Sequence, residues 1–305
     1  MARRPDGERG AYPGGASLLA GGDGWVLVED APERALGGAL AWGRKHGVRA
    51  LHVVVDSPEA AGVLARRAAA FTVPPSVWVA TGTFLEPAVA APPAEQAPLS
   101  ADDAALAPSI VEAGAEPVVE HGVLRGEVLG LEVCRVVGGR LEVGMGKHDR
   151  EAQLLVHGGR PSVEVLADAV RAVREVRTAD GPPHEMRRLA AERWLRAVVC
   201  RRPELVGCSR LEPVPPPVPR GDLRLPAPAP AVGEGVVAVC SVGVDTDLVP
   251  TAADARLVHG PDSRLLLVVP EQDDHPLTRA LAASLAQPAE VVTVPDDWRH
   301  FALCS

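Results

Sequence analysis

Three short apolar runs decide the fold of the first part of the chain: Trp25–Glu29 (WVLVE), Leu51–Val55 (LHVVV) and Ser76–Ala80 (SVWVA). Continuous runs of this kind are typical of strands that are buried on both faces. Residues 32–46 and 57–71, which lie between the runs, have the residue spacing and end signals of helices. The alternation predicts a three-stranded parallel β-α-β unit over residues 24–88.

The end of the chain has the same organisation. Three further apolar runs predict strands at Val236–Ser241, Arg264–Val269 and Glu290–Val294, and a helix is expected over His275–Ala286. Residues 233–305 therefore predict a second three-stranded parallel β-α-β unit. Two arrangements stay open, and the marginal stability of units of this size alone favours joining. The units are separate, or they join into one doubly wound sheet.

The block between the two units predicts an α+β domain over residues 109–210. We expect strands over 116–119, 126–137 and 140–144, and the Gly138-Gly139 pair favours a tight turn and antiparallel pairing. Two helices are expected to follow, over 162–176 and 184–202. The predicted fold class is thus α/β, with two parallel units flanking a middle α+β block. The remaining segments are a flexible N-terminus (1–23), a Pro/Ala-rich linker (89–108) and a Pro-rich connector (211–232).

Composition excludes several classes of protein. The 305 residues are 47% hydrophobic with a formal net charge of −9, so the chain is not intrinsically disordered. The longest apolar runs are far shorter than the roughly 18 residues that a membrane span needs, so no membrane association is expected. The N-terminus lacks the apolar stretch of a signal peptide, and the five cysteines form no C-x-x-C pair. A cytoplasmic location is the expectation.

Charge is distributed unevenly. Residues 121–224 carry 18 basic and 14 acidic side chains, which gives +4 and leaves −13 for the rest of the chain. In the predicted helix 184–202, Arg187, Arg188 and Arg196 are candidate contacts to phosphate or to an acidic partner. The block could thus bind a small molecule or nucleic acid, and a protein partner also stays open. The alternative is a packed amphipathic helix whose arginines pair with the acidic flanking units.

A first carboxylate cluster follows the strands of the last unit. Ligands of open parallel sheets bind beyond the carboxyl ends of the strands, where this chain has Asp245, Asp247, Glu271 and Asp273. Their oxygens are suitable ligands for Mg²⁺ or Mn²⁺. Asp245-x-Asp247 resembles the phosphohydrolase pattern in which a strand ends in Asp-x-Asp, but Leu248-Val249-Pro250 follow where that pattern has a small residue and Thr. The alternative is that these acids cap helices and solvate turns.

A second cluster lies in the middle block. Glu132 lies on a predicted strand, and Glu142, Lys147 and His148 follow around two glycines. The arrangement predicts a metal-dependent phosphodiesterase site, in which the carboxylates hold Mg²⁺ and Lys147 or His148 orients water. Residues 116–176 resemble restriction-endonuclease-type cores, which implies nuclease activity. Those cores have Glu/Asp-x-Lys, whereas Glu142 and Lys147 are five residues apart. A solvated turn with a helix cap is the alternative.

The sequence lacks two common motifs that bind nucleotide cofactors. No Gly-x-Gly-x-x-Gly follows the first strand, and Gly144-Met145-Gly146-Lys147 departs from the P-loop at both ends. The chain therefore has no dinucleotide or P-loop signature. The sequence favours a metal-dependent hydrolase of phosphoesters, of nuclease-like type. Two alternatives stay open: a non-catalytic protein that binds a nucleotide or small metabolite, and a protein-interaction scaffold.

Overall fold

The structure is a computed structural model that describes residues 7–146, 149–150, 162–219 and 225–303. In these residues the chain is a mixed α/β protein with three sheets, in which most strand pairs with an assigned direction are antiparallel. The chain divides into two compact units. The first contains residues 1–93, 244–267 and 274–291, and the second contains 94–243, 268–273 and 292–305. The six-segment division made from the sequence stays a prediction.

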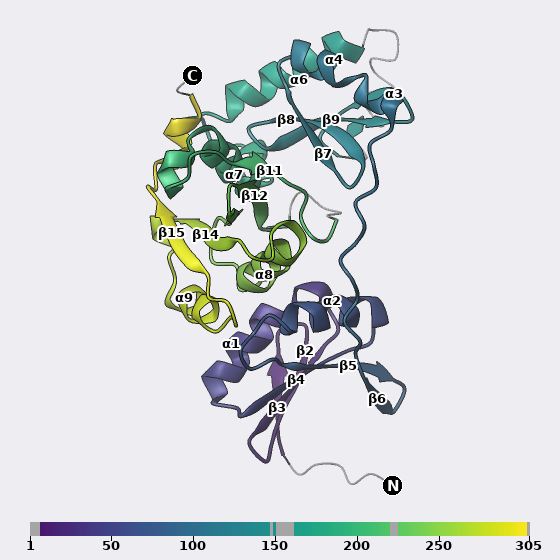
Figure 1. The fold of residues 1–305 in the computed structure, drawn as a ribbon, viewed down its shortest axis with the longest axis vertical. Helices are drawn as coiled ribbons and strands as arrows, with labels where there is room; N and C mark the ends of the chain where they lie inside the picture. The colour runs from purple at the N-terminus through teal and green to yellow at the C-terminus, as the bar shows by residue number, and fades with distance from the viewer. Residues whose placement is uncertain (1–6, 147–148, 151–161, 220–224, 304–305) are drawn as a thin grey trace. The chain divides into compact units, whose positions relative to one another are not determined.

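The first unit contains a six-stranded sheet (Figure 1) with the strand order β1-β2-β3-β4-β5-β6. The three apolar runs form β3, β4 and β5, which pair in parallel, while the outer strands pair antiparallel. Residues 8–20, which were expected to be flexible, form the hairpin β1–β2. The strands are β1 (Glu8–Tyr12), β2 (Gly15–Ala20), β3 (Asp23–Val28), β4 (Ala50–Val55), β5 (Ser76–Thr81) and β6 (Phe84–Pro87).

Helices α1 (Leu36–His46) and α2 (Pro58–Ala68) pack against this sheet (Figure 1). Burial alternates along β3, where Gly24, Val26 and Val28 are buried, as the period of two in a strand requires. Ser57 begins α2 by accepting a hydrogen bond from the Ala60 N–H at 3.2 Å. Gly47, with φ of 62°, ends α1 in the left-handed conformation that glycine tolerates.

Two helices from the end of the chain belong to the same unit. Helix α8 (Leu248–His259) contacts α1 and α2, and α9 (Pro276–Ala283) contacts α1 and α8. Helix α8 was not among the helices predicted from the sequence. Its residues from Leu248 to Arg256 are all buried, so the helix lacks the polar face that produces an amphipathic pattern.

A buried ion network joins α2 to α8. Asp254 accepts hydrogen bonds from Arg66 Nε at 2.7 Å, Arg66 Nη2 at 3.0 Å and Arg67 Nε at 3.1 Å. Arg67 also donates to Asp247 Oδ2 at 3.0 Å. All four side chains are buried. The network therefore fixes α8 on α2 across 188 positions of sequence.

The second unit contains a four-stranded antiparallel sheet with the order β10-β9-β8-β7. The strands are β7 (Glu116–Glu120), β8 (Val123–Val128), β9 (Leu131–Val137) and β10 (Arg140–Val143). The prediction of one strand over 126–137 was wrong. Leu129 and Gly130, with φ of 48° and 75°, form a turn inside it. Because Leu129 is apolar, the turn interrupts no apolar run and leaves no signal in the hydrophobic pattern.

One face of the four-stranded sheet is apolar. Leu124, Cys134 and Val136 are buried on it. Helices α4 (Ala107–Glu112) and α6 (Ser162–Val176) pack against the sheet, and Figure 1 shows them close to β8 and β9. The sequence predicts a linker over residues 89–108. Within it lies the short helix α3 (Ala101–Ala104), and α4 begins at its end.

The predicted helix 184–202 is divided. Residues Glu185–Arg187 form a 3-10 turn (η2), Ala190 has φ of 47°, and α7 spans Ala191–Arg201. Helix α7 contacts strands β12 (Ala229–Gly233) and β13 (Val236–Cys240) and the 3-10 helix η5 (Trp298–Leu303).

The C-terminal strands form a five-stranded sheet with the order β11-β12-β13-β14-β15, in which β11 is Glu212–Pro213, β14 is Arg264–Pro270 and β15 is Glu290–Val294. The alternative of one joined, doubly wound sheet was therefore wrong. Strand β2 occupies the outer edge of β3, β6 occupies that of β5, and β12 occupies that of β13. Each predicted group of three strands is extended by strands of its own, which leaves these edges closed to the other group.

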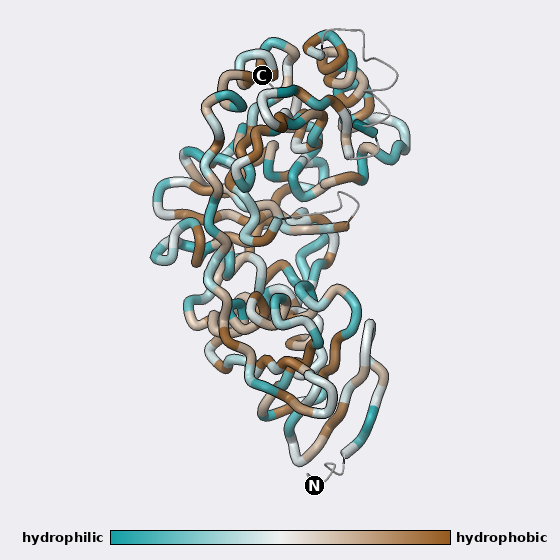
Figure 2. Tube along the Cα trace, turned by 90° about the vertical axis from the view of Figure 1, so that its right-hand side faces the viewer, coloured by the Kyte–Doolittle hydropathy of each residue, from teal (hydrophilic) through white to brown (hydrophobic). Residues whose placement is uncertain are grey.

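Hydrophobic residues occur as short runs separated by hydrophilic ones (Figure 2). Among the described residues, no helix combines the length and the apolar character needed to cross a bilayer.

The buried network predicts a strong effect of Asp254→Asn. The variant keeps the size of the side chain but removes the charge that pairs with Arg66 and Arg67. Two buried guanidinium groups then lose their common carboxylate, so we expect the free energy of unfolding to fall by about 3–5 kcal/mol. Urea unfolding measures it. The control is Asp274→Asn, which breaks an exposed pair with Arg279 and should have little effect. Equal effects of the two variants would contradict the network's role.

Candidate functional site

The second face of the four-stranded sheet carries charged side chains. In the strand register, Glu116 lies opposite Glu127, and Glu127 lies opposite Glu132. Arg135 pairs with Arg125 on one side and with Glu142 on the other. Paired residues share a face, so these side chains lie together. We call the charged face the set Glu120, Glu127, Glu132, Glu142, Arg125 and Arg135 of the sheet, with Arg150, Arg193 and Arg196 that pair with them.

Helix α7 closes the deep part of the charged face. Arg193 donates to Glu127 Oε1 and to Glu120 Oε2, each at 2.7 Å, and Arg196 donates to Glu127 Oε2 at 3.0 Å. A Cβ at Gly130 would lie 2.3 Å from the carbonyl carbon of Arg193. Because glycine permits this approach, the β8–β9 turn packs directly on α7.

The electrostatics of this deep part favour the charged forms. Burial raises the pKa of Glu120, but Arg193, Arg196 and Arg125 lower it by more, so the pKa of Glu120 lies below its ordinary value. Burial lowers the pKa of Arg193, and the carboxylates of Glu127 and Glu120 raise it above its ordinary value. The shifts of both Glu120 and Arg193 thus favour the charged form, and their ion pair holds β7 against α7.

The charged face opens to solvent at the β9–β10 end. Glu132 accepts from Arg125 Nη1 at 2.5 Å, Arg135 Nη2 at 2.8 Å and Arg150 Nη1 at 3.2 Å. Arg150 Nε also lies 3.6 Å from Glu142 Oε2. Glu142 is 47% exposed, whereas Glu132 is 1% exposed. One guanidinium group therefore lies between a buried and an exposed carboxylate.

A two-glycine loop positions Arg150. The Gly144 N–H donates to the Val133 carbonyl at 2.8 Å, and the Arg150 N–H donates to the Gly146 carbonyl at 2.9 Å. Gly144 has φ of 140°, and a Cβ there would lie 2.7 Å from the Arg150 nitrogen. Only glycine fits this approach, so the loop places Arg150 over Glu132. Burial lowers the pKa of Arg150, with a further contribution from Arg135.

The structure brings together two of the four residues that the sequence singled out as catalytic. Glu132 and Glu142 converge on Arg150. Lys147 and His148 lie outside the described residues.

Asp245 and Asp247, predicted as metal ligands, already have protein partners. Asp245 accepts from Arg34 at 3.1 Å, and from the Asp247 N–H at 2.9 Å. Asp247 accepts from Arg67 and from the Thr251 hydroxyl, each at 3.0 Å. Both carboxylates therefore lie at the start of α8 and tie it to Arg34 and Arg67 of the same unit.

Glu271 and Asp273, the other two predicted metal ligands, belong to the second unit. Glu271 is exposed, and Asp273 accepts a hydrogen bond from the Gly243 N–H at 2.7 Å. Among the described residues, no group of three or more His, Cys, Asp or Glu side chains is arranged to hold a metal ion.

The three predicted phosphate contacts separate into two environments. Arg196 is buried in the charged face, where it pairs with Glu127. It lies there because α7 turns this side chain toward the sheet. Arg187 and Arg188 lie at the surface, in η2 and at its end.

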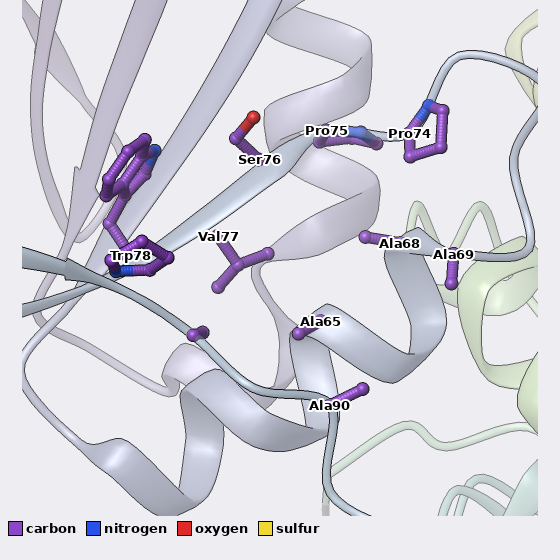
Figure 3. A pocket seen from close by; sticks show the side chains of 11 residues that line it. Ala65, Ala68, Ala69, Pro74, Pro75, Ser76, Val77, Trp78 and Ala90 are labelled. Atoms are coloured by element: carbon purple, nitrogen blue, oxygen red, sulfur yellow. The ribbon is translucent and has the colours of Figure 1, made fainter.

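An apolar pocket lies in the first unit (Figure 3). It has a volume of about 490 Å³ and is lined mainly by small residues of α2, β5 and the segment after β6, including Ala65, Pro75, Val77 and Trp78. No charged side chain lines it. It offers an apolar surface but no acid, base or nucleophile apart from the Ser76 hydroxyl.

Sequence reasoning missed most of the charged face, namely Glu120, Arg125, Arg150, Arg193 and the pairing of Glu127. A usable signal was present. Glu116 and Glu120 are four residues apart, and Arg125 and Glu127 are two apart, so each pair has the even spacing of one strand face. The partners on α7 lie about 70 residues further along the chain, where no local pattern points to them.

Asp247 predicts that stability depends on pH. Burial raises its pKa from 3.8 to about 6. Between these values the folded chain holds a proton that the unfolded chain releases, so the free energy of unfolding should fall as pH rises from about 4 to about 6. The expected change is on the order of 2–3 kcal/mol. Asp247→Asn should flatten this part of the pH profile, measured by urea unfolding, whereas the exposed Asp262→Asn should not. An unchanged slope in Asp247→Asn would refute the assignment.

Comparison with known proteins adds no family to this description. A scan against protein-family models, a search of curated proteins and a search of solved structures find no match to the chain.

Proposed function

We propose that the protein is a metal-dependent phosphoester hydrolase, and that its reaction centre is the open end of the charged face. The observation that carries the proposal is the convergence of Glu132 and Glu142 on Arg150, at 3.2 and 3.6 Å. Two carboxylates from neighbouring strands that share one cationic partner also suit a divalent cation such as Mg²⁺ or Mn²⁺. The guanidinium group of Arg150 lies between the two carboxylates.

The surrounding arginines support this chemistry. Arg125 and Arg135 lie beside Glu132 and are 15% and 29% exposed. When Arg150 leaves the carboxylates, three guanidinium groups border the centre, and guanidinium groups bind phosphate oxygens in bidentate geometry. A bound divalent cation supplies a Lewis acid and lowers the pKa of a bound water. The role of the chain is to orient the phosphate and to supply the two carboxylates as ligands.

The energetic character of the charged face also favours a functional role. Apolar residues in place of a buried ion-pair network often give equal or greater stability. A sheet face on which four glutamates pair with five arginines is therefore not expected to be more stable than an apolar face of the same size. Clusters of interacting titratable groups of this kind are typical of functional sites.

A second candidate function is non-catalytic binding of a nucleotide or small metabolite. The observation that favours it is that every carboxylate of the charged face pairs with an arginine in the described structure. If Arg150 stays on Glu132 and Glu142, no metal enters, and the part-exposed Arg125 and Arg135 bind the phosphate of the ligand without catalysis.

Hydrolysis separates the two candidates. We expect the chain to cleave bis-p-nitrophenyl phosphate or single-stranded DNA with Mn²⁺ or Mg²⁺ and not with EDTA. Glu142→Gln, at an exposed position, should lower turnover by about 100-fold or more, since one metal ligand is lost. Glu290→Gln, in an exposed pair with Arg264, is the matched control. If nucleotides stabilise the chain against heat and no hydrolysis occurs, the second candidate holds. If neither occurs, both fail.

The competition between Arg150 and the metal gives an independent prediction. Arg150→Ala removes the positive charge between Glu132 and Glu142, so Mn²⁺ should bind at least about 10-fold more tightly than to the native chain. Titration followed by Mn²⁺ electron paramagnetic resonance measures the affinity. Arg140→Ala removes an exposed arginine of the same sheet and serves as the control. Equal or weaker Mn²⁺ binding by Arg150→Ala would contradict a metal site at this position.

A further inference from the structure

We infer that the second unit has a separate phosphate-binding surface made by Arg187, Arg188 and Arg299, with Arg177 beneath them. We call these four residues the arginine patch. They lie on η2, on η5 and at the end of α6, away from Glu132 and Glu142 in sequence.

Two tryptophans hold the patch together. The Arg299 guanidinium carbon lies 4.2 Å from the ring centroid of Trp298 and 5.3 Å from that of Trp194. The Arg177 guanidinium carbon lies 4.9 Å from the same Trp194 ring. The two rings meet edge to face, with centroids 5.7 Å apart. Cation–π contacts therefore gather two guanidinium groups around one buried indole.

The arginines of the patch contact backbone carbonyls and indole rings, whereas the arginines of the charged face contact carboxylates. Arg177 donates to the carbonyls of Leu129 at 2.6 Å and Met186 at 2.8 Å, and also to that of Leu189. Arg187 donates to the carbonyl of Ala179 at 2.8 Å. Such contacts orient a guanidinium group and leave its positive charge uncompensated.

The acidic groups near the patch include Glu185 of η2 and Asp180, which lies 3.8 Å from His300. Asp273 acts on Arg299, and Glu127 and Glu192 act on Arg177. Asp273 accepts the Gly243 N–H, and Glu127 is paired with Arg193 and Arg196. Among the described residues, none of Arg177, Arg187 and Arg299 forms an ion pair within 4.0 Å.

The guanidinium groups repel one another. Burial lowers the pKa of Arg299, and the charge of Arg187 lowers it further. Burial also lowers the pKa of Arg177 to about 9, while Glu127 raises it and Arg299 lowers it. A bound anion would reduce this repulsion, in keeping with the cation–π contacts that bring Arg177 and Arg299 to the same indole.

The chemistry of the patch favours a phosphate group over a carboxylate. A phosphate monoester carries close to two negative charges at neutral pH and offers three acceptor oxygens, which match several guanidinium forks at once. Trp194 and Trp298 are fully buried, so their faces cannot stack on a nucleobase. The patch should therefore bind the phosphate and be indifferent to the base or sugar attached to it.

Binding at the patch requires no divalent cation, which separates this proposal from the hydrolase. The experiment is a titration in EDTA with three probes: inorganic pyrophosphate, ATP and a fluorescent 15-mer of thymidine. Isothermal calorimetry follows the first two, and fluorescence anisotropy follows the third. The patch variant is Arg188→Ala/Arg299→Ala, which spares the buried Arg177. The matched control is Arg264→Ala/Arg279→Ala, which removes two exposed arginines from the first unit.

We expect the patch variant to bind at least 10-fold more weakly than the native chain, with a control close to native. Binding of pyrophosphate and ATP identifies a small phosphate ligand, and binding of the oligonucleotide alone identifies a nucleic-acid backbone. Equal binding by the patch variant and the native chain overturns the proposal. So does a chain that binds polyglutamate as tightly as the phosphate probes, or binds none of them. Thermal unfolding of both double variants checks that the fold is intact.

Discussion

Both units depend on guanidinium groups paired with carboxylates out of contact with water. In the first unit, Asp254 receives three hydrogen bonds from Arg66 and Arg67. In the second, Arg193 joins Glu120 and Glu127 across the sheet. Arginine suits this task because its planar group is always charged and binds a carboxylate in two-pronged geometry. Burial makes the pairing obligatory, since a lone buried charge costs several kcal/mol, and so each pair fixes the elements that carry it.

Two groups of arginines in the second unit differ in the groups that they contact. Those of the charged face meet glutamates, which keeps the sheet, α7 and the two-glycine loop in one arrangement. Those of the arginine patch meet carbonyls and indole rings, which orient charge without cancelling it. The first group accounts for how the unit is built, and the second gives it a surface with unsatisfied charge. A net charge of −9 for the whole chain conceals this division.

The parts of the fold that the sequence predicts are the parts with a local pattern. Strands β3, β4 and β5 follow from continuous apolar runs, and α2 follows from Ser57 and the proline after it. Helix α8 was not predicted because burial on all sides removes its polar stripe. The Leu129-Gly130 turn was not predicted because its first residue is apolar. The candidate site was predictable only in part. Glu132 and Glu142 stand out near two glycines, but the arginines that meet Glu120 and Glu127 lie on α7, far along the chain, and their pairing depends on the tertiary fold.

The first unit is discontinuous, and this has a consequence for how the chain acquires its structure during synthesis. When residues 1–93 leave the ribosome, Arg66 and Arg67 have no Asp254, because 188 positions separate Arg66 from Asp254. Folding that relies on such distant contacts is slow, since the loop must close before the contact stabilises it. The surface of α1 and α2 that α8 covers therefore stays exposed until residues 244–267 have been translated. During that interval the chain is open to aggregation and to chaperone binding.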